Sequence, residues 1–381
     1  MRFLIVDTDY PAFLNRLYTT NSSLDMKSFE EQMRAHSESC FGQASFFASN
    51  LQALGHEARY VTANNVYAQK QWAQEHGLNV SSDWGWEFRL RRGLIPWVSR
   101  IRTQRWFYEV LTAQIRDFKP DILLNQAVNE IPGRFMREIR PYVRFVIGQH
   151  AATALSDKED YGGYDLMISS FLPTVTWCQT RGIAAVQIRL GFEPKLLSTL
   201  QSSGKDFDLT FTGSFLRVHR SRHLWLEELC RHFPQLKIWG PSREQIPTTS
   251  EVRNRYMGSA WGRDMFHVLS SSKIVLNHHG DVAPYANNMR LFEATGMGTC
   301  LVTDWKPNLG EFFEVGKEVL AYRSIDECVE LIRYYLAHQE EREAIARSGQ
   351  VRTLHEHTYY QRMQDLYTTV SQLVSNRFKA A

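Results

Sequence analysis

The sequence predicts an α/β protein made of two Rossmann-like domains, each built on a parallel sheet. Short buried strands alternate with helices in two series, and a polar passage separates the series. The chain has 381 residues, more than one hydrophobic core usually serves, so two domains are expected. A helical tail from Ile325 is expected to be interrupted near Gly349 and around residues 355–358.

The N-terminal half begins with an apolar run at Phe3–Asp7, which predicts a buried parallel strand. A long helix is expected from Asp25 to Leu54, ending at Gly55. Further strands alternate with helical segments, as in a doubly wound sheet. These strands are expected at 58–62, 121–124, 143–147, 166–169 and 185–190, with a helix at 174–181.

The polar passage from Glu193 to Asp206 predicts the linker between the domains. We expect domains at 1–193 and 194–358, and a C-terminal helix at 359–381 that packs back on the first domain. The two domains would face a central cleft suited to a ligand. Strands of the second domain are expected at 209–212, 236–239, 274–277, 299–303 and 319–322.

Composition indicates an ordinary globular protein. Hydrophobic residues are 43% and charged residues 22%, and a net charge of +3 does not favour a dedicated nucleic-acid binder. Five cysteines without a CxxC spacing predict reduced, mostly buried thiols. No signal peptide is recognisable, and no apolar run reaches the ~18 residues of a membrane span, so we expect a cytoplasmic protein.

The stretch Lys273–Asp304 predicts a strand, a polar loop, a helix, a Gly turn and a second strand. Parallel strands joined by a helix place the loop and the helix start at one sheet edge, where an anionic ligand is favoured. Asn288 and Arg290 lie at the expected helix start, and Glu293 shares a helical face with Arg290. This cation and carboxylate could address a phosphate and a sugar hydroxyl. An ion pair between them is the alternative.

Several blocks of the sequence fall in order at sensible spacing. They are TGSF at 212–215, SSKIVLNHHGD at 271–281, NNMRLFEATGMG at 287–298, and the segments 301–324, 354–363, 10–18 and 55–65. These blocks resemble the CgeB-like (spore maturation protein) glycosyltransferases of GT-B fold, group 1 type. The resemblance implies two Rossmann-like domains that face a central cleft, with a C-terminal crossover helix. It also implies a nucleotide-sugar donor held by the C-terminal domain and an acceptor held by the N-terminal one.

Within this resemblance, Glu293 matches the carboxylate with which related GT-B enzymes hold the donor ribose. An ionised carboxylate suits a diol because it accepts two hydrogen bonds. Retaining relatives often carry a second Glu eight residues earlier, where this chain has Tyr285. A contact to the transferred sugar would then come from Asp281 or from backbone amides. The block as a whole implies a retaining, metal-independent transferase without a cofactor.

Other donor-binding candidates follow strands of the second domain. Gly213 and Ser214 form a turn whose amides could approach a phosphate. Trp239 and Gly240 end the next strand, where a base could stack, although core packing of Trp239 is the alternative. One of two adjacent histidines, taken as His279, would line the cleft. Cations near the Gly turn, which could neutralise a phosphate or simply cap the next helix, are Arg217, His219, Arg220 and Arg222.

A metal site is not expected from the pair His219 and His223, because no further ligand stands at a supporting spacing. The catalytic candidates are Asp7, Asp9 and His150, which end strands of the first domain. They could orient or deprotonate an acceptor hydroxyl, and His150 could instead hydrogen-bond the donor sugar or the leaving phosphate. An Asx turn for the two aspartates and a structural role for His150 are the alternatives. Asp7-Thr8-Asp9 also spells the metal-binding DxD of another glycosyltransferase fold, which its position in the acceptor domain disfavours.

Residues 84–106 combine tryptophans with arginines. Six arginines and no acidic residue lie between Arg89 and Arg105. This composition suits an anionic membrane surface or an acidic acceptor. The alternative, which we favour, is a solvated arginine-rich helix face.

The sequence therefore predicts a glycosyltransferase that moves a sugar from a nucleotide-sugar to an acceptor hydroxyl, in the cytoplasm or at the inner face of the membrane. The acceptor could be a glycan, a lipid-linked molecule, a protein or a small molecule. One alternative is a GT-B-fold nucleotide-sugar epimerase, which would share the donor site. Another is a non-catalytic sugar- or nucleotide-binding assembly factor. The base, the sugar and the acceptor are not named by the sequence.

Overall fold

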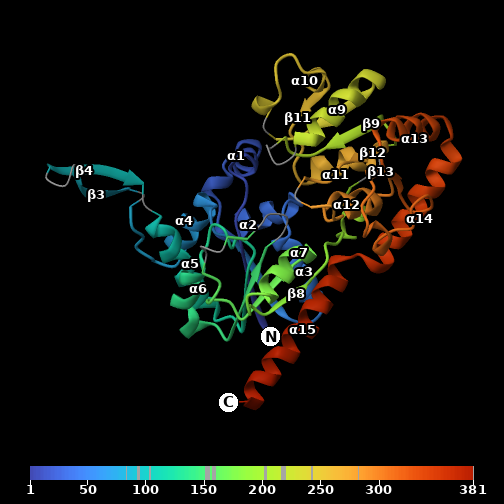
Figure 1. Ribbon diagram of the computed structural model, residues 1–381. Helices are drawn as coiled ribbons and strands as arrows, with labels where there is room; N and C mark the ends of the chain where they lie inside the picture. The colour runs from blue at the N-terminus through green and yellow to red at the C-terminus, as the bar shows by residue number, and fades with distance from the viewer. Residues whose placement is uncertain are drawn as a thin grey trace. The chain divides into compact units, whose positions relative to one another are not determined.

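A computed structural model describes most of the chain (Figure 1). It covers the sequence except for residues 83, 92–94, 103, 151–154, 157–159, 201–203, 216–219, 242, 282 and 381. At 84–91, 95–102, 220 and 376–380 it describes the backbone only.

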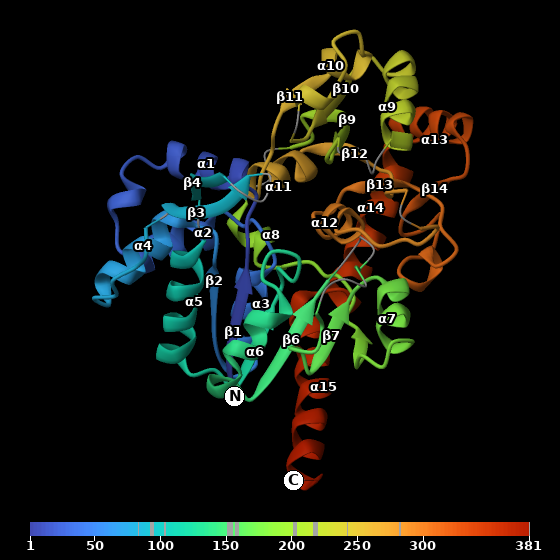
Figure 2. The same ribbon diagram turned by 60° about the vertical axis from the view of Figure 1, so that its left-hand side comes forward.

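Two six-stranded sheets with helices around them form the structure. In the first sheet the strand order is β2-β1-β5-β6-β7-β8, and Figure 2 shows β1, β6 and β7 of this sheet. Strand β1 pairs in parallel with both β2 and β5, as expected for a doubly wound sheet. The strands are β1 (Arg2–Asp7), β2 (Glu57–Thr62), β5 (Ile122–Asn125), β6 (Phe145–Gln149), β7 (Leu166–Ser169) and β8 (Ala185–Gln187).

The second sheet has the order β11-β10-β9-β12-β13-β14, and all of its pairs are parallel. In both sheets the chain starts near the middle, builds outward to one side and then crosses to the other. The strands are β9 (Phe207–Thr212), β10 (Leu236–Trp239), β11 (Tyr256–Gly258), β12 (Ser272–Asn277), β13 (Cys300–Asp304) and β14 (Leu320–Tyr322).

The α-helices that accompany the strands of the first sheet are α1 (Pro11–Thr20), α2 (Phe29–Glu38), α3 (Ala44–Ala53), α4 (Val66–Glu75), α5 (Arg105–Phe118), α6 (Gly133–Glu138), α7 (Leu172–Gln179) and α8 (Leu196–Thr199). Those that follow are α9 (Arg220–His232), α10 (Glu251–Asn254), α11 (Arg263–Ser270), α12 (Arg290–Gly296), α13 (Ile325–Ala337), α14 (Gln339–Glu356) and α15 (Tyr359–Ala380). Short 3₁₀ turns are η1 (Leu24–Met26), η2 (Arg140–Tyr142), η4 (Arg243–Gln245) and η5 (Leu309–Glu311).

The chain divides into two compact units. Unit 1 comprises Met1–Glu38, Gly55–Gln149 and Asp157–Leu166. Unit 2 comprises Ser39–Leu54, His150–Ser156 and Met167–Ala381. Each unit is described by itself, and the expected boundaries 1–193, 194–358 and 359–381 stay a prediction.

Each unit has its own hydrophobic core. In unit 1, apolar side chains of β1, β2, β5 and β6 pack with those of α4, α5 and α6. In unit 2, the second sheet packs with α9, α13 and α14. Fully burying a Leu, Ile or Phe side chain stabilises a fold by about 1.5–3 kcal/mol, so these faces fix which side of each strand points inward. The unit 2 core includes Leu209, Phe211, Leu226, Leu229, Ile274, Leu276, Val302 and Ile332.

The single helix expected from Asp25 to Leu54 is wrong. The segment forms η1, α2 and α3, with a break at residues 39–43. Cys40 has φ of 57° and Gly42 has φ of 78°, and a left-handed backbone cannot continue a right-handed helix. The break also matters for domain assignment, because α2 belongs to unit 1 and α3 to unit 2.

The helix face expected for the arginine-rich stretch is also wrong. Residues Trp84–Arg91 (β3) and Ile95–Arg102 (β4) pair antiparallel as a separate two-stranded sheet, and only residues from Arg105 onward are helical, in α5 (Figure 1). Aromatic and β-branched residues are frequent in this stretch, a composition that fits strands better than a helix. The side chains of this hairpin lie outside the described residues.

The interruption expected at Gly349 is wrong, whereas the one around residues 355–358 is confirmed. Helix α14 runs through Gly349, and the breaks fall at His338 and at residues 357–358. A Cβ atom on Gly349 would lie 2.4 Å from the carbonyl oxygen of Glu318. The glycine therefore allows α14 to approach the loop before β14 rather than ending the helix.

All five cysteines lack a disulfide, as predicted. Cys178, Cys230, Cys300 and Cys328 are buried, and Cys40 is partly exposed. No helix in the described part of the chain combines the length and the apolar character that crossing a bilayer requires.

Candidate functional site

The carboxyl ends of β9 and β12 lie side by side in the second sheet, at the point where the strand order reverses. Open α/β sheets bind ligands at such a point. After β9 the chain continues into Gly213 and Ser214, and after β12 into His278 and His279. The sequence-predicted donor segments are therefore neighbours in unit 2.

Arg222 on α9 ties these two segments together. Its Nη2 donates to the carbonyl of His278 (2.7 Å), and its Nη1 donates to the carbonyl of Ser214 (3.1 Å). The side chain is buried, and burial lowers the pKa of the guanidinium to about 10, so it remains charged at neutral pH. Through these contacts Arg222 positions the two loops and places a positive charge next to them.

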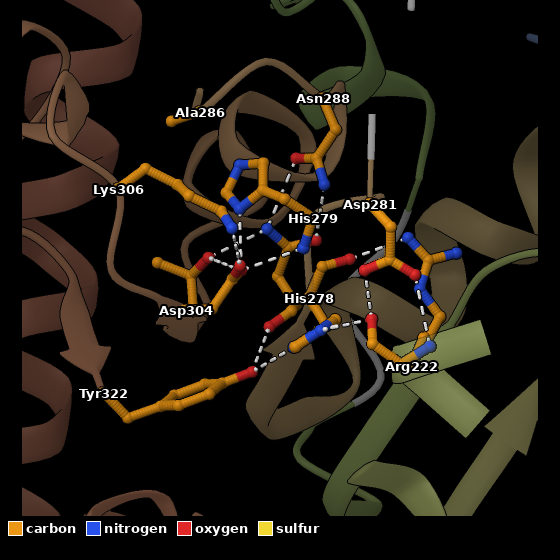
Figure 3. A network of polar contacts seen from close by, with 12 residues as sticks. Arg222, His278, His279, Asp281, Ala286, Asn288, Asp304, Lys306 and Tyr322 are labelled. Atoms are coloured by element: carbon orange, nitrogen blue, oxygen red, sulfur yellow. Dashed lines mark hydrogen bonds and ion pairs between the residues drawn. The ribbon is translucent and has the colours of Figure 1, made fainter. Parts of the chain in front are cut away.

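His279 and Asp304 form a buried pair at the ends of β12 and β13 (Figure 3). Oδ1 of Asp304 accepts from the backbone N–H (2.8 Å) and from Nδ1 of His279 (2.7 Å), and Nζ of Lys306 lies 3.0 Å from Oδ2. Burial alone would raise the pKa of Asp304, but its hydrogen bonds to His279 and the nearby histidine charge hold that pKa well below its usual range. The ionised carboxylate can only accept, so Nδ1 of His279 carries a proton, and the buried Nε2 on the other side of the ring makes no hydrogen bond within the described residues.

His278 packs against aromatic side chains of unit 2, as expected for one of the two histidines. Its ring stacks on Trp225 with centroids 5.0 Å apart, and its Nδ1 lies 2.9 Å from the hydroxyl of Tyr322. Burial lowers the pKa of His278, with help from Arg222, so the ring is neutral at physiological pH. The Tyr322 hydroxyl also reaches the carbonyl of Asn277 (3.1 Å), which fixes the end of β12.

Arg290 and Glu293 form the ion pair that was the alternative reading of their spacing. Nη1 of Arg290 lies 2.7 Å from Oε2 of Glu293, and Nη2 donates to the carbonyl of Thr212 at the end of β9 (3.3 Å). Both side chains are largely buried, and burial raises the pKa of Glu293 against the opposing charge of Arg290. Oε1 of Glu293 makes no hydrogen bond within the described residues, so one carboxylate oxygen is held and the other is available.

Buried polar atoms without a hydrogen bond gather around this site. Buried polar groups are nearly always bonded, so a group of exceptions calls for an explanation. Five of the fifteen such atoms among the described residues belong to this site, on side chains from the ends of β9, β12 and β13 and from α9 and α12. These five atoms are Thr212 Oγ1, Arg222 Nε, His279 Nε2, Arg290 Nε and Asp304 Oδ2.

Asn288 and Gly240 have structural partners. The amide of Asn288 pairs with that of Asn277, donating to its Oδ1 (2.8 Å) and accepting from its Nδ2 (3.3 Å). A Cβ atom on Gly240 would lie 2.0 Å from the carbonyl oxygen of Gly213, so the two turns need this glycine to approach each other. Trp239 packs its ring against Phe207, with centroids 5.3 Å apart.

In unit 1, Asp7 is the last residue of β1 and Asp9 lies two residues further on, again beside the reversal of strand order between β1 and β5. Burial raises the pKa of Asp7 to about 7, the charge of Asp9 adds to the rise, and the hydrogen bond from the Thr8 N–H (2.8 Å) opposes it. A carboxyl with such a pKa is suited to exchange a proton at neutral pH.

Asp9 is held by a residue that the sequence did not reveal. Oδ2 of Asp9 lies 2.7 Å from Nε2 of His36 on α2, and both side chains are buried. Nδ1 of His36 in turn lies 3.1 Å from the hydroxyl of Tyr60 on β2. The Asp9 carboxylate is thus fixed from behind, whereas Asp7 has fewer constraints.

The remaining candidates are placed as follows. His150 is buried after β6 and belongs to unit 2; its backbone N–H donates to the carbonyl of Ile168 (3.1 Å). Arg217 and His219 lie outside the described residues. Among the residues that are described, no three His, Cys, Asp or Glu side chains are grouped to hold a metal ion. Metal independence stays a prediction.

Residues 220–368 match the family model described as glycosyl transferase-like. No curated protein matches the chain in sequence. Among solved structures, HepE of Anabaena in complex with UDP-glucose has a TM-score of 0.58 and 13% identity, over 98% of this chain and 100% of that chain. Sucrose-phosphate synthase from Thermosynechococcus elongatus has a TM-score of 0.55 and 12% identity over 100% of both chains. A glycosyltransferase from Rickettsia africae has a TM-score of 0.59 and 9% identity, over 98% and 99%.

The two parallel α/β sheets and these whole-chain similarities define the GT-B fold, which confirms the predicted fold class. At such low sequence identities, the similarity to these solved structures shows only that the fold is shared. The matched family region supplies the class of activity, and it includes Arg222, the His278–His279 loop and the Arg290–Glu293 pair. The chain is therefore a glycosyltransferase of GT-B fold.

Proposed function

We propose that the enzyme transfers a sugar from a nucleoside diphosphate sugar, bound by unit 2, to an acceptor hydroxyl. The observation that carries this proposal is the group of unbonded buried polar atoms at the ends of β9 and β12. A nucleoside diphosphate brings phosphate oxygens and hydroxyls that can satisfy such atoms. HepE has been solved with UDP-glucose, and the pneumococcal O-GlcNAc transferase GtfA with UDP and GlcNAc. Uridine diphosphate sugars are therefore the first donors to test.

Three groups of residues would each bind a different part of the donor. Oε1 of Glu293 would accept from a ribose hydroxyl while Arg290 holds Oε2. Arg290, Arg222 and the backbone of Gly213 and Ser214 would stabilise the diphosphate as it leaves. Nε2 of His279 would accept a hydrogen bond from a hydroxyl of the transferred sugar, since Asp304 holds the opposite ring nitrogen.

Trp239, Gly240 and Asn288 would support the donor pocket rather than touch the leaving group, given their structural contacts. Arg217 and His219 remain donor-binding proposals from the sequence. On the acceptor side, Asp7 would be the base that receives the hydroxyl proton, and Asp9 would orient the acceptor under the hold of His36. His150 is proposed to contact donor sugar or phosphate.

We further propose that the enzyme retains the configuration of the sugar and needs neither a metal nor a cofactor. We also propose that it has a CgeB-like specificity within the group 1 glycosyltransferases. Asp281 is a candidate for the sugar contact that Tyr285 does not supply, although its Oδ2 now accepts from the backbone N–H of Ser221 (3.2 Å). We also propose a cytoplasmic enzyme whose residues 84–106 touch an anionic membrane or an acidic acceptor. The acceptor is proposed to be a glycan, a lipid-linked molecule, a protein or a small molecule.

The test is a thermal-shift screen of the full chain against nucleoside diphosphates and nucleotide sugars, on the wild type and on Glu293→Ala. A ligand at 100 times its Kd stabilises the folded state by about 2.7 kcal/mol, which a melting curve detects readily. The wild type should prefer uridine diphosphate over an analogue lacking both ribose hydroxyls by about tenfold or more. Glu293→Ala should bind the two compounds equally weakly.

The matched control is Glu314→Ala, which removes an exposed carboxylate elsewhere in unit 2 and should leave both responses unchanged. If no nucleotide stabilises the wild type, the donor proposal is wrong. If Glu293→Ala still discriminates between the compounds, Glu293 is only the partner of Arg290.

A further inference from the structure

A cavity of about 210 Å³ lies at the opposite edge of the second sheet from the donor residues. Its lining includes Lys273 near the start of β12, Cys300 at the start of β13 and a face of α14. The strand ends that carry the proposed donor site are the other ends of these same strands. The cavity is therefore a separate place in unit 2, and nothing in the proposed transfer reaction uses it.

Four cations and one carboxylate line the cavity: Lys205, Lys273, Arg342, Arg347 and Glu343. Two of the cations are already neutralised. Nζ of Lys273 lies 2.7 Å from Oδ1 of Asp208, and Nη1 of Arg347 lies 3.6 Å from Oε2 of Glu343. The other two cations, Lys205 and Arg342, make no ion pair within the described residues. The cavity thus retains two positive charges without a partner.

Each of these two cations keeps N–H donors that make no hydrogen bond within the described chain. Lys205 has three N–H groups, and two of them donate to the carbonyl of Ser270 (2.8 Å) and to the hydroxyl of Thr299 (3.2 Å). Arg342 is buried and uses Nη1 on the carbonyls at the end of α13, at Tyr335 (2.6 Å) and Leu336 (3.2 Å). Its Nε and Nη2 make no hydrogen bond within the described chain.

The two positive charges act on each other. Partial burial of the ammonium group lowers the pKa of Lys205 to about 8, and the nearby charge of Arg342 adds to the fall. The charge of Glu343 opposes this effect, and a bound dianion would further offset the repulsion between the two cations. A guanidinium presents a planar fork and an ammonium a point charge, and both are common partners of phosphate.

We propose that this cavity is a second, non-catalytic ligand site that binds a phosphate dianion, either inorganic phosphate or a phosphate monoester. Lys205 and Arg342 supply the charge, and the volume leaves room for a small substituent on the phosphate. Because the ligand would join the segment before β9 to α13 and α14, its binding stabilises unit 2. The site is independent of whether the proposed donor residues are correct.

The first experiment is calorimetric titration of the full-length wild type with inorganic phosphate, and separately with glucose 6-phosphate, at pH 7. Saturable binding of one or both is expected, and the tighter ligand identifies the source of the phosphate group. Lys205→Met should weaken that binding by about tenfold or more. Lys317→Met, which removes an exposed lysine outside the cavity, should bind phosphate as the wild type does. Absence of saturable phosphate binding in the wild type overturns the proposal, as does unchanged binding by folded Lys205→Met.

A second measurement needs no variant. Trace acetylation followed by peptide mass spectrometry reports the reactivity of each lysine, because only the unprotonated amine reacts. Phosphate should slow acetylation of Lys205 several-fold by raising its pKa and covering it, without slowing that of Lys317. Equal rates at Lys205 with and without phosphate overturn the proposal.

Discussion

At the scale of single residues, one carboxylate can determine the chemistry of its neighbour. Asp304 holds both the backbone and the ring of His279, so it sets the position of the loop after β12 and the tautomer of the histidine. Asp7 is controlled differently, since burial and the charge of Asp9 raise its pKa to about 7. The first arrangement fixes the position of a loop and of an imidazole ring, and the second produces a carboxyl that can change its protonation near neutral pH.

Asp7 should make the stability of the protein depend on pH. Its pKa is about 7 in the folded state against 3.8 for a model carboxyl, so folding favours the protonated form. The resulting stability is fully present below about pH 4 and is lost as pH rises through 7, a loss on the order of 4 kcal/mol. Asp7→Asn should therefore lose less free energy of unfolding than the wild type between pH 5 and pH 8.5, measured by urea denaturation.

Asp117→Asn provides the comparison, because it removes an exposed carboxylate of the same unit on α5. It should follow the wild-type pH dependence. Parallel pH curves for wild type and Asp7→Asn would mean that Asp7 is ionised throughout this range.

The residues of the candidate site differ in whether they can be identified from the sequence alone. Arg290 and Glu293 could be predicted as a pair from their helical spacing, and they do form an ion pair. Asp304 was not singled out, although an acidic residue at the end of a predicted strand is a usable signal. His36 gave no signal, because its contact with Asp9 joins two positions 27 residues apart through tertiary packing.

At the scale of the elements, glycines show where local propensity is a poor guide. Glycine is unfavourable in a helix, which is why an interruption was expected at Gly349. The close approach of the Glu318 carbonyl outweighs that propensity. Strand positions were more accessible to prediction: β7 and β10 fall where the apolar runs placed them, because buried parallel strands need continuous hydrophobic segments.

Gly349→Ala should destabilise the protein, although alanine is the better helix former. The new Cβ would lie 2.4 Å from the Glu318 carbonyl oxygen, and overpacking of this kind costs about 1–3 kcal/mol. Urea denaturation of the full chain measures the change. Gly310→Ala in η5 is the matched control, because a Cβ there meets nothing within 4 Å. A Gly349→Ala variant as stable as Gly310→Ala would show that α14 can shift away.

At the scale of the whole molecule, the alternation of strands and helices was enough to predict two Rossmann-like sheets. It does not indicate that residues 39–54, which lie between β1 and β2, group with unit 2. Such long-range grouping comes from packing that no local pattern records. Strand β11 and the β3–β4 hairpin were missed for a related reason, as short or isolated strands carry little hydrophobic signal.

Because each unit has its own core, a nucleotide bound by unit 2 should stabilise unit 2 more than unit 1. Hydrogen exchange with and without uridine diphosphate should show added protection in peptides covering 209–215, 273–281 and 288–304. Peptides covering β2 and α5 should exchange at the same rate in both samples. Equal protection of all these peptides would argue against a donor site confined to unit 2.

The cysteine distribution has a practical consequence for spectroscopy. Burial raises the thiol pKa of Cys178 and Cys328, and raises those of Cys230 and Cys300 to about 12, so almost no reactive thiolate forms at these positions. A maleimide dye should therefore attach to Cys40 in the unaltered chain. The carbonyl of the adjacent Ser39 accepts a hydrogen bond from the backbone N–H of Arg263 (2.8 Å), at the start of α11. A fluorophore at this one position would thus report optically on α11 without any engineered label site.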